Sequence, residues 1–206
     1  YDLSECLVGS EMCIRVSLAH IRRHFSAADI ELRVDSNGAF SPEDALRKLT
    51  QLNEFQLHSI EQPVRAGQWE VMKELCATSP FPIALDEELI GVNETERKIQ
   101  LLDTIRPQYI ILKPSLHGGI QGSKEWITLA QERGIGYWVT SALESNIGLN
   151  AIAQWCATLQ PKMPQGLGTS MLFTDNIDYP LHIEGDCLWF HPEEKTPDFP
   201  TYLQTI

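Results

Sequence analysis

The sequence predicts an α/β fold in which short parallel strands alternate with helices, and three observations lead to that prediction. Charged residues recur at an almost constant interval, because Asp35, Glu61, Asp86 and Lys113 are separated by 26, 25 and 27 residues. Each follows a short apolar run rich in Val, Ile and Leu. Each precedes turn residues and then a helix-like stretch. The interval is about the length of one strand-plus-helix unit, so the four side chains should lie at the carboxyl ends of neighbouring parallel strands.

The individual elements follow from the apolar pattern. We expect strands near 30–35, 56–61, 83–86, 109–113 and 136–141, a weaker strand near 164–169, and helices over about 41–52, 68–78, 93–104, 119–133 and 147–159. Ser41 and Pro42 supply a cap and a proline for the start of the first of these helices. Gly134 ends the fourth, where a left-handed residue is favoured. Doubly wound sheets also alternate strands and helices, but they do not place charged residues at the same position on four successive strands. A (β/α) barrel is therefore predicted.

Length and composition limit the possibilities further. A closed (β/α)8 barrel typically takes about 250 residues, so a chain of 206 residues predicts a partial TIM barrel. The net charge of −12 argues against nucleic acid and anionic membranes as partners. The apolar runs are too short to cross a bilayer. Five cysteines without a CxxC pair indicate reduced thiols. We expect a cytoplasmic protein that is a monomer or a weak homo-oligomer.

Three segments are predicted along the chain. Residues 1–17 have neither a clean strand period nor a clean helix period, and we expect a leader that is non-native or disordered. Residues 18–179 would form the partial barrel with its site. Residues 180–206 contain four prolines and the alternating segment LHIEGDCLWF, which indicates a hairpin or a closing tail.

The charged residues at the strand ends suggest a metal site. An aspartate before Asn-Gly, such as Asp35, is by itself only a turn former. The repeat of Asp35, Glu61 and Asp86 at barrel period favours a shared function, because solvated charges have no reason to recur in this way. Three hard oxygen ligands suit Mg²⁺, with Mn²⁺ as a possible substitute, and they leave positions for water and for a small carboxylate substrate. No His or Cys stands at the equivalent positions, which argues against zinc.

Other conspicuous residues have simpler interpretations. Glu88 belongs to an acidic run and is expected to be solvated. The segment 20–24, HIRRH, reads as a solvated helix face. Ser141 has neither a histidine partner nor a nucleophile elbow, so covalent hydrolase chemistry is not expected. Trp126 and Trp155 lie within helical patterns and are expected to be packing residues.

Four motifs together resemble a known family. In order and spacing, VDSNGAF, SIEQP, ALDEE and ILKPS resemble the enolase superfamily and, within its muconate-lactonizing-enzyme-like group, the o-succinylbenzoate synthase family. The resemblance runs from about residue 18 to the end of the chain. It implies barrel strands three to eight of the superfamily's C-terminal domain, with the N-terminal capping domain missing.

The resemblance also implies roles for individual residues. Asp35, Glu61 and Asp86 match the three magnesium ligands, and Lys113 matches a catalytic lysine on the sixth strand. Further positions would orient the ligands (Asn37, Gln62 and Glu87) or hold a substrate carboxylate (Ser141 and Ser145). Lys113 would act as an electrostatic stabiliser or, in racemases of the family, as an acid and base.

The implied reaction is a Mg²⁺-assisted dehydration in menaquinone biosynthesis. A cyclohexadiene carboxylate becomes aromatic succinylbenzoate through an enediolate. The family's base is the second lysine of a Lys-x-Lys pair one βα unit before the first ligand, whereas the first lysine here is Lys48. We therefore expect an inactive fragment of an active enzyme.

Two alternatives remain open. The first is an N-succinylamino acid racemase or a dipeptide epimerase on the same scaffold. It is disfavoured because GLGT at 166–169 stands where epimerases of the family usually carry Asp-x-Asp. The second is a non-catalytic metal-binding fragment with open sheet edges.

Overall fold

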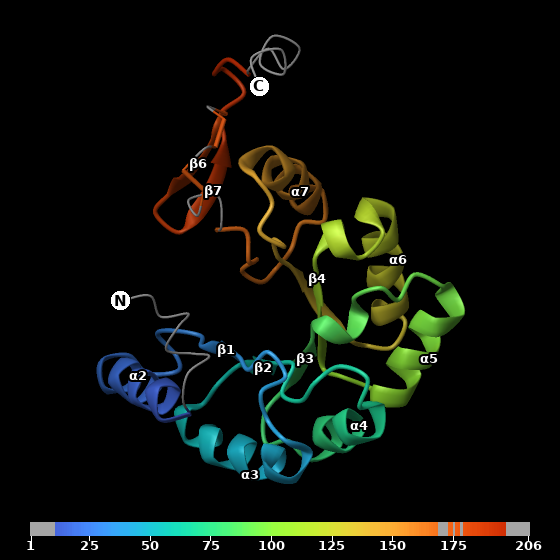
Figure 1. Cartoon of the computed structure of the whole chain (residues 1–206). Coiled ribbons are helices and arrows are strands. Elements are labelled where there is room, and N and C mark those ends of the chain that lie inside the picture. Colours follow the sequence, from blue (N-terminus) through green and yellow to red (C-terminus); the bar gives the residue numbers. More distant parts are fainter. Residues whose placement is uncertain (1–10, 169–172, 175, 178, 197–206) are drawn as a thin grey trace. The chain divides into compact units, whose positions relative to one another are not determined.

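The computed structural model describes residues 11–168, 173–174, 176–177 and 179–196 (Figure 1). The chain divides into two compact units, unit 1 (Tyr1–Ile111 and Glu125–Tyr137) and unit 2 (Leu112–Lys124 and Trp138–Ile206). The first helix, α2, covers Glu11–His24, so it begins before the expected start at residue 18. The predicted boundaries of the three segments stay a prediction.

From residue 33 onward, strands and helices alternate as the sequence predicts, although the first two strands begin three residues later than expected and the other boundaries agree to within two residues. The strands are β1 (Arg33–Asp35), β2 (Ser59–Glu61), β3 (Ile83–Leu85), β4 (Tyr109–Leu112) and β5 (Gly136–Val139). The helices that alternate with them are α3 (Pro42–Leu52), α4 (Trp69–Thr78), α5 (Thr95–Ile105), α6 (Gly119–Gln131) and α7 (Asn146–Thr158). Short 3-10 helices follow α3, β3 and β4: η1 (Asn53–Phe55), η2 (Glu87–Leu89) and η3 (Pro114–Leu116).

The five strands form one sheet in the order β1-β2-β3-β4-β5. The pairs β1–β2, β2–β3 and β3–β4 are parallel. Sequential parallel strands joined by helices are the arrangement of a (β/α) barrel, which confirms the predicted fold class. The weaker strand expected near 164–169 is reduced to one parallel bridge between Thr140 and Gly166. Added side-chain bulk at Gly166 would clash, because a Cβ there would lie 2.5 Å from Oγ1 of Thr140.

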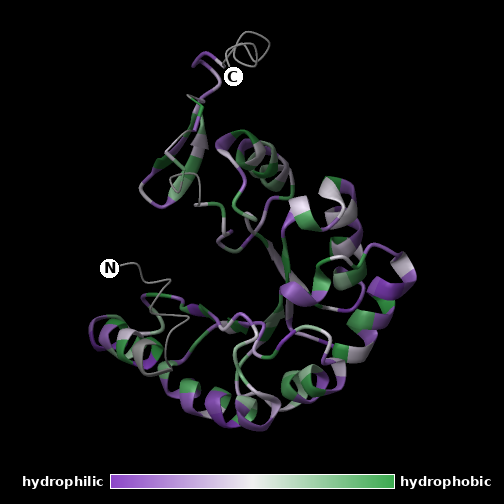
Figure 2. Ribbon diagram, in the orientation of Figure 1, coloured by the Kyte–Doolittle hydropathy of each residue, from purple (hydrophilic) through white to green (hydrophobic). Residues whose placement is uncertain are grey.

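The helices of unit 1 pack through one apolar face. Helix α3 starts at the predicted position, with Ser41 in an extended conformation and Pro42 in the first turn, but the side chain of Ser41 makes no capping hydrogen bond. Its buried residues are Ala45, Leu49 and Leu52, spaced four and three residues apart, which is the spacing of one helix face. Figure 2 shows hydrophobic and hydrophilic residues alternating along α3 in the same way.

Helices α5 and α6 are joined by an ion pair between a buried lysine and a half-buried glutamate. The ammonium of Lys98 contacts the carboxylate of Glu125, which also accepts a hydrogen bond from the hydroxyl of Thr95. Lys98 is only 1% exposed, and its Nζ lies 5.5 Å from the ring centre of the fully buried Trp126. Trp126 is thus a packing residue, as predicted.

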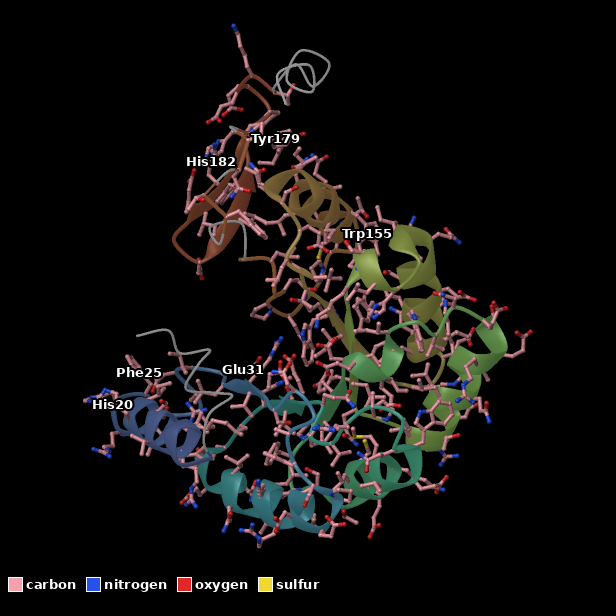
Figure 3. All side chains as sticks on the ribbon, viewed as in Figure 1. His20, Phe25, Glu31, Trp155, Tyr179 and His182 are labelled. Carbon is pink, nitrogen blue, oxygen red and sulfur yellow. The ribbon has the colours of Figure 1, made fainter. Side chains whose placement is uncertain are left out.

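Arg22 ties α2 to the rest of unit 1 and is half-buried, so it does more than lie on a solvated helix face. Its guanidinium donates to the backbone carbonyls of Phe55 at 2.8 Å and Ile30 at 2.9 Å. It also donates to the carbonyls of Ser26 at 3.2 Å and Gln56 at 3.3 Å. A guanidinium offers five fixed donors, so one side chain can serve several carbonyls at once. The neighbouring segment is exposed as expected, and His20 lies on α2 (Figure 3).

Unit 2 ends in an antiparallel hairpin of β6 (Leu181–Glu184) and β7 (Cys187–Phe190), which confirms the hairpin interpretation of this segment. Gly185 lies in its turn with φ +65°. Before the hairpin, the hydroxyl of Tyr179 accepts a hydrogen bond from the side chain of Asn150 on α7 at 3.3 Å. Figure 3 labels Tyr179 and, on α7, Trp155, which is 6% exposed and packs as predicted.

Candidate metal centre

Two of the predicted metal ligands stand directly opposite each other in the sheet. Asp35 ends β1 and is the register partner of Glu61, which ends β2. Glu61 is in turn the partner of Ala84 in β3, and Asp86 follows Ala84 by two residues. Side chains alternate between the two faces with period two, and neighbouring strands lie about 4.8 Å apart. The register therefore assigns the three carboxylates to one face and one rim of the sheet within unit 1.

The side chains themselves do not form a closed ligand cluster. In the described part of the chain, no group of three or more His, Cys, Asp or Glu residues could hold a metal ion. Asp35 and Glu61 are half-buried, whereas Asp86 is 1% exposed. The structure provides the common rim for these residues, and the metal site itself stays a prediction.

The turn after β1 holds Asp35 from its own backbone. The N–H of Asn37 donates to Oδ1 of Asp35 at 2.8 Å, and Asn37 adopts a left-handed conformation with φ +44°. Gly38 follows with φ +68°, and a Cβ at this position would lie 2.9 Å from Cα of Arg65. The close approach requires glycine because the next loop passes directly beside it. Asn37 was predicted to orient the ligands, and it contacts Asp35 through its backbone.

Gln62 and Glu88 form a buried hydrogen-bonded pair behind the carboxylates. Gln62 is 1% exposed, and its Nε2 donates to Oε2 of Glu88 at 3.3 Å and to the carbonyl of Val64 at 3.0 Å. Oε1 of Glu88 accepts from the N–H of Gly67 at 2.8 Å. Glu88 is 5% exposed, so the expectation that it is solvated is wrong. A carboxylate can be buried here because two donors satisfy it.

For Glu87, the remaining predicted orienting residue, and for Lys113, the predicted catalytic lysine, the structure gives burial and backbone contacts. Glu87 opens η2 and is half-buried. Lys113 directly follows β4 in unit 2 and is half-buried, and its N–H donates to Nδ1 of the buried His117 at 3.1 Å. The contact fixes the backbone that carries Lys113. The roles of Glu87 and Lys113 stay predictions.

The two predicted substrate-binding serines lie at either end of one loop in unit 2. Ser141 is buried, and its hydroxyl accepts a hydrogen bond from the N–H of Leu143 at 2.9 Å. Its backbone N–H donates to the carbonyl of Gly166 at 3.1 Å. Ser145 is exposed at the start of α7 and makes no side-chain capping hydrogen bond. Their contact with a substrate carboxylate stays a prediction.

Glu144, between these serines, was missed by the sequence analysis. Its carboxylate accepts hydrogen bonds from the hydroxyl of Ser115, after β4, and from the N–H of Ala142 at 2.9 Å. Burial acts to raise the pKa of Glu144, but hydrogen bonds from Ser115, Ser141 and Ala142 outweigh it and hold the pKa below its ordinary value. An ionised carboxylate thus joins the loops after β4 and β5. An acidic residue between two candidate serines was the available signal.

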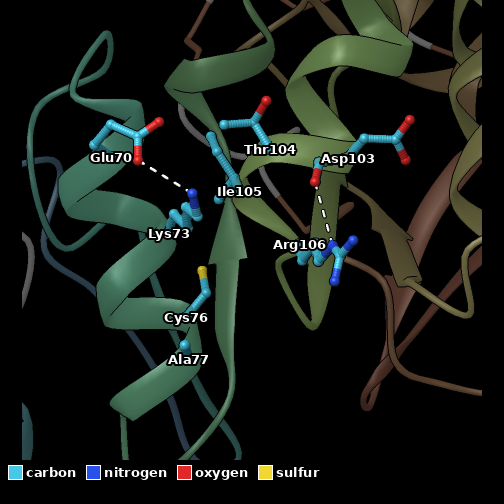
Figure 4. Close-up of a pocket in the computed structure, with 8 residues that line it drawn as sticks. All are labelled: Glu70, Lys73, Cys76, Ala77, Asp103, Thr104, Ile105 and Arg106. Atoms are coloured by element: carbon cyan, nitrogen blue, oxygen red, sulfur yellow. Dashed lines mark hydrogen bonds and ion pairs between the residues drawn. The ribbon is translucent and has the colours of Figure 1, made fainter.

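A groove of about 680 Å³ lies elsewhere in unit 1, between α4 and the C-terminal end of α5 (Figure 4). Its lining residues are Glu70, Lys73, Cys76, Ala77, Asp103, Thr104, Ile105 and Arg106. The side chain of Gln108, just before β4, donates to the carbonyl of Cys76 at 3.0 Å and accepts from the N–H of Ile83 at 2.9 Å. The ends of these helices therefore lie where β3 and β4 begin, at the rim opposite the carboxylates. Burial raises the pKa of Cys76 to about 12, so its thiol is not a nucleophile.

The fold and the strand-end residues agree with a family comparison. Residues 13–193 match the model of the enolase C-terminal domain-like family, and the chain belongs to this family. It is similar to the o-succinylbenzoate synthase of Desulfotalea psychrophila, with 60% identity over 171 residues, which are 83% of this chain and 46% of that protein. The chain thus spans about half the length of the curated relatives that it matches.

Solved structures of related enzymes share this fold. The crystal structure of MenC from Desulfotalea psychrophila has a TM-score of 0.81 and 59% identity, over 84% of this chain and 48% of that one. A dipeptide epimerase from Enterococcus faecalis, complexed with Mg and the dipeptide L-Leu-L-Tyr, has a TM-score of 0.66 and 25% identity. That match covers 77% of this chain and 44% of the epimerase. Within the described residues, no helix has the length and hydropathy that a bilayer crossing requires.

Proposed function

We propose that the chain is part of an o-succinylbenzoate synthase, a hydro-lyase of menaquinone biosynthesis. The observation that carries this proposal is the 60% identity over 171 residues with the Desulfotalea psychrophila enzyme. The substrate would be a small cyclohexadiene carboxylate, which loses a proton beside its carboxylate and then water. The chain covers 46% of that enzyme, so the complete activity is proposed for the whole protein.

We further propose that Asp35, Glu61 and Asp86 hold Mg²⁺ or, in its place, Mn²⁺. The register supports this assignment, since it brings three oxygen ligands to one face of adjacent strand ends. The related epimerase was solved with Mg, which adds support from the same fold. When bound, the cation supplies positive charge next to the substrate carboxylate as the proton leaves.

The protein residues would divide the remaining work. Lys113, directly after β4, would place an ammonium beside the developing negative charge. Ser141 and Ser145 would donate hydrogen bonds to a substrate carboxylate. No lysine precedes Lys48, so the base that the family places before the first ligand has no counterpart in this sequence. We infer that the chain alone does not complete the dehydration.

The direct test is a chimera. The N-terminal part of the Desulfotalea psychrophila enzyme, with the capping domain and the first barrel strands, is fused to this chain from residue 18. The fusion is then assayed for formation of succinylbenzoate. The proposal is supported if the activity needs Mg²⁺ and if Asp35→Asn lowers it by about 100-fold or more. A loss of this order is expected when the charge of the transition state loses its stabiliser. A folded chimera without dehydratase activity would contradict it, and Gln100→Glu on the exposed face of α5 is a matched control.

Epimerisation is the second candidate, favoured by the likeness to the Enterococcus faecalis dipeptide epimerase. The sequence at 166–169 lacks the expected Asp-x-Asp, which speaks against it. Incubation of the chimera with an N-succinyl amino acid in deuterated water separates the two. Exchange of the α-proton without any dehydratase activity would favour the racemase and epimerase alternative, and metal binding without either activity would leave the non-catalytic metal-binding fragment.

A further inference from the structure

Gln62 contacts all three of the strand ends that carry the predicted metal ligands. It directly follows Glu61 in the sequence. Its backbone carbonyl accepts hydrogen bonds from the N–H of Gly38 at 2.7 Å and from the hydroxyl of Ser36 at 2.9 Å, both in the turn after Asp35. Its side-chain Oε1 accepts from the N–H of Asp86 at 3.2 Å. Among the described residues next to the three carboxylates in the sequence, Gln62 alone makes hydrogen bonds both to the turn after Asp35 and to the backbone of Asp86.

The side-chain amide of Gln62 uses its whole hydrogen-bonding capacity. Oε1 also accepts from the N–H of Glu88 at 3.4 Å, and Nε2 donates to the carbonyl of Val64 and to the carboxylate of Glu88. A glutamine side chain has two donors and one oxygen with two lone pairs, and all four are occupied. The orientation of the amide is also determined, because a flipped amide would set donors against donors and oxygens against oxygens.

The backbone of Gln62 is itself unusual, with φ +35°. Such a conformation is rare for a residue with a side chain, and it persists where the surrounding contacts determine it. Here the contacts come from both neighbouring strand ends. The N–H of Gln62 donates to the carbonyl of Ala84 at 3.0 Å, and the N–H of Ser36 donates to the carbonyl of Glu61 at 3.2 Å.

We propose that Gln62, braced by Glu88, is a positioning residue that sets the spacing of Asp35, Glu61 and Asp86 for a divalent cation. The proposal rests on the metal site of the proposed function and adds the residue that fixes its geometry. Gln62 would not touch the cation. It would hold the Asp86 backbone and the turn after Asp35 in one arrangement, which lowers the conformational entropy lost when the ligands close on the cation.

Charge and geometry make opposite predictions for Gln62→Glu, which is the basis of the test. The substitution adds a negative charge near the site, and charge alone would tighten Mn²⁺ binding. It also removes both donors and sets two buried carboxylates against each other. If Gln62 positions the ligands, Gln62→Glu should weaken Mn²⁺ binding by about 10- to 100-fold, as is common when groups behind metal ligands are lost.

The double variant Gln62→Glu with Glu88→Gln provides the rescue. It keeps the net charge of the wild-type chain and restores the hydrogen bond between the two side chains with its polarity reversed. The introduced amide at position 88 can still accept from the N–H of Gly67. We expect at least half of the lost binding free energy to return. Gln100→Glu, which adds the same charge on exposed α5, should change the affinity by less than about twofold, the limit set by distant screened charges.

Binding is measured with Mn²⁺ by electron paramagnetic resonance on the full chain. A metal-independent readout accompanies it. In Gln62→Met the backbone amides of Asp86 and Glu88 should exchange with deuterium at least tenfold faster than in the wild type, while the amide of Ile60 within β2 should not change. This result would show that Gln62 orders the strand ends even before a cation is added.

The outcomes separate this proposal from the one on which it rests. If the wild-type chain binds no Mn²⁺, or if Asp35→Asn binds it equally well, the metal site is wrong and the role of Gln62 at that site is wrong with it. If the wild type binds but Gln62→Glu binds equally well or more tightly, only the positioning role is overturned. A double variant no better than the single one, or unchanged exchange at Asp86 in Gln62→Met, also overturns it.

Discussion

The part-buried ion pair between Lys98 and Glu125 should respond unequally to the loss of its two partners. The side chain of Lys98 is 2% exposed and that of Glu125 is 31% exposed. Removing one partner of a buried pair costs about 3–5 kcal/mol when the other charge stays buried and uncompensated. Glu125→Ala leaves the ammonium of Lys98 in this situation, and we expect the free energy of unfolding to fall by about 3 kcal/mol.

Lys98→Met should cost less. Methionine is one atom shorter than lysine but keeps most of the apolar stem of the side chain, whereas the contact of the ammonium with the Trp126 ring is lost. The Glu125 carboxylate that remains still contacts the hydroxyl of Thr95 and is accessible to water. Because it is not fully buried, the cost should be about 1–2 kcal/mol, the low end for loss of a charged hydrogen bond. The double variant Lys98→Met with Glu125→Leu should unfold at a free energy closer to the wild type than Glu125→Ala alone does.

Urea unfolding followed by circular dichroism measures these differences, and the pH dependence provides a second check. Hydrogen bonds from Lys98 and then from Thr95 hold the pKa of Glu125 below its ordinary value of 4.5. A lowered carboxylate pKa contributes stability that is present above the ordinary pKa and is lost as the pH falls through the lowered one. Lys98→Met should reduce this acid-side loss. The reasoning fails if Lys98→Met is as destabilising as Glu125→Ala, or if the acid-side profile is unchanged.

Three further predictions concern other parts of the chain. Arg22→Ala should lower the free energy of unfolding by about 2 kcal/mol, mainly through loss of the part-buried hydrogen bond to Phe55, and Arg22→Lys should retain part of that stability. The midpoints of urea unfolding measure both effects, and equal midpoints for the two variants would contradict the role of Arg22 in binding several carbonyls. The hydrogen bond that the His191 imidazole donates to the Glu184 carboxylate raises the pKa of His191. Its contribution to the hairpin should therefore be complete below pH 6.5 and be lost as the pH rises through the raised pKa; NMR titration of the imidazole checks this, and a pKa at or below 6.5 would refute it. A maleimide should label the exposed Cys187 in the native protein but Cys76 only after unfolding. Peptide mass spectrometry identifies the labelled cysteine, and labelling of Cys76 in the native protein would contradict the prediction.

The sequence predicted the framework of this chain well because its signals are local and periodic. Each of the first four strands is a short apolar run that ends in, or directly precedes, a charged residue, and the interval between Asp35, Glu61 and Asp86 is the length of one strand-plus-helix unit. The register then follows, since equivalent positions of successive units meet on neighbouring strands. The weaker strand near 164–169 was overestimated, because a glycine-containing segment formed a single bridge to Thr140.

The polar contacts behind these strand ends could not be predicted in the same way. Glu88 looked solvated because it stands in an acidic run, yet two donors far apart in the sequence make its burial possible. Arg22 looked like part of a charged helix face, but its acceptors are carbonyls of loops up to 34 residues away. Glu144 was overlooked because its partner Ser115 comes from another loop. Contacts of this kind depend on side-chain rotamers and loop paths, which leave no period in the sequence.

This difference bears on how the candidate metal centre should be understood. Register alone brings Asp35, Glu61 and Asp86 to one face, but strand pairing tolerates small shifts that would change the distances between carboxylates. Gln62 would restrict such shifts, since its backbone carbonyl accepts hydrogen bonds from the turn after β1 and its side-chain oxygen accepts one from the backbone after β3. A methionine of similar length at position 62 would pack in the same space without joining the three strand ends. The proposed positioning role would therefore explain a glutamine at this position through its backbone contacts, which packing alone does not.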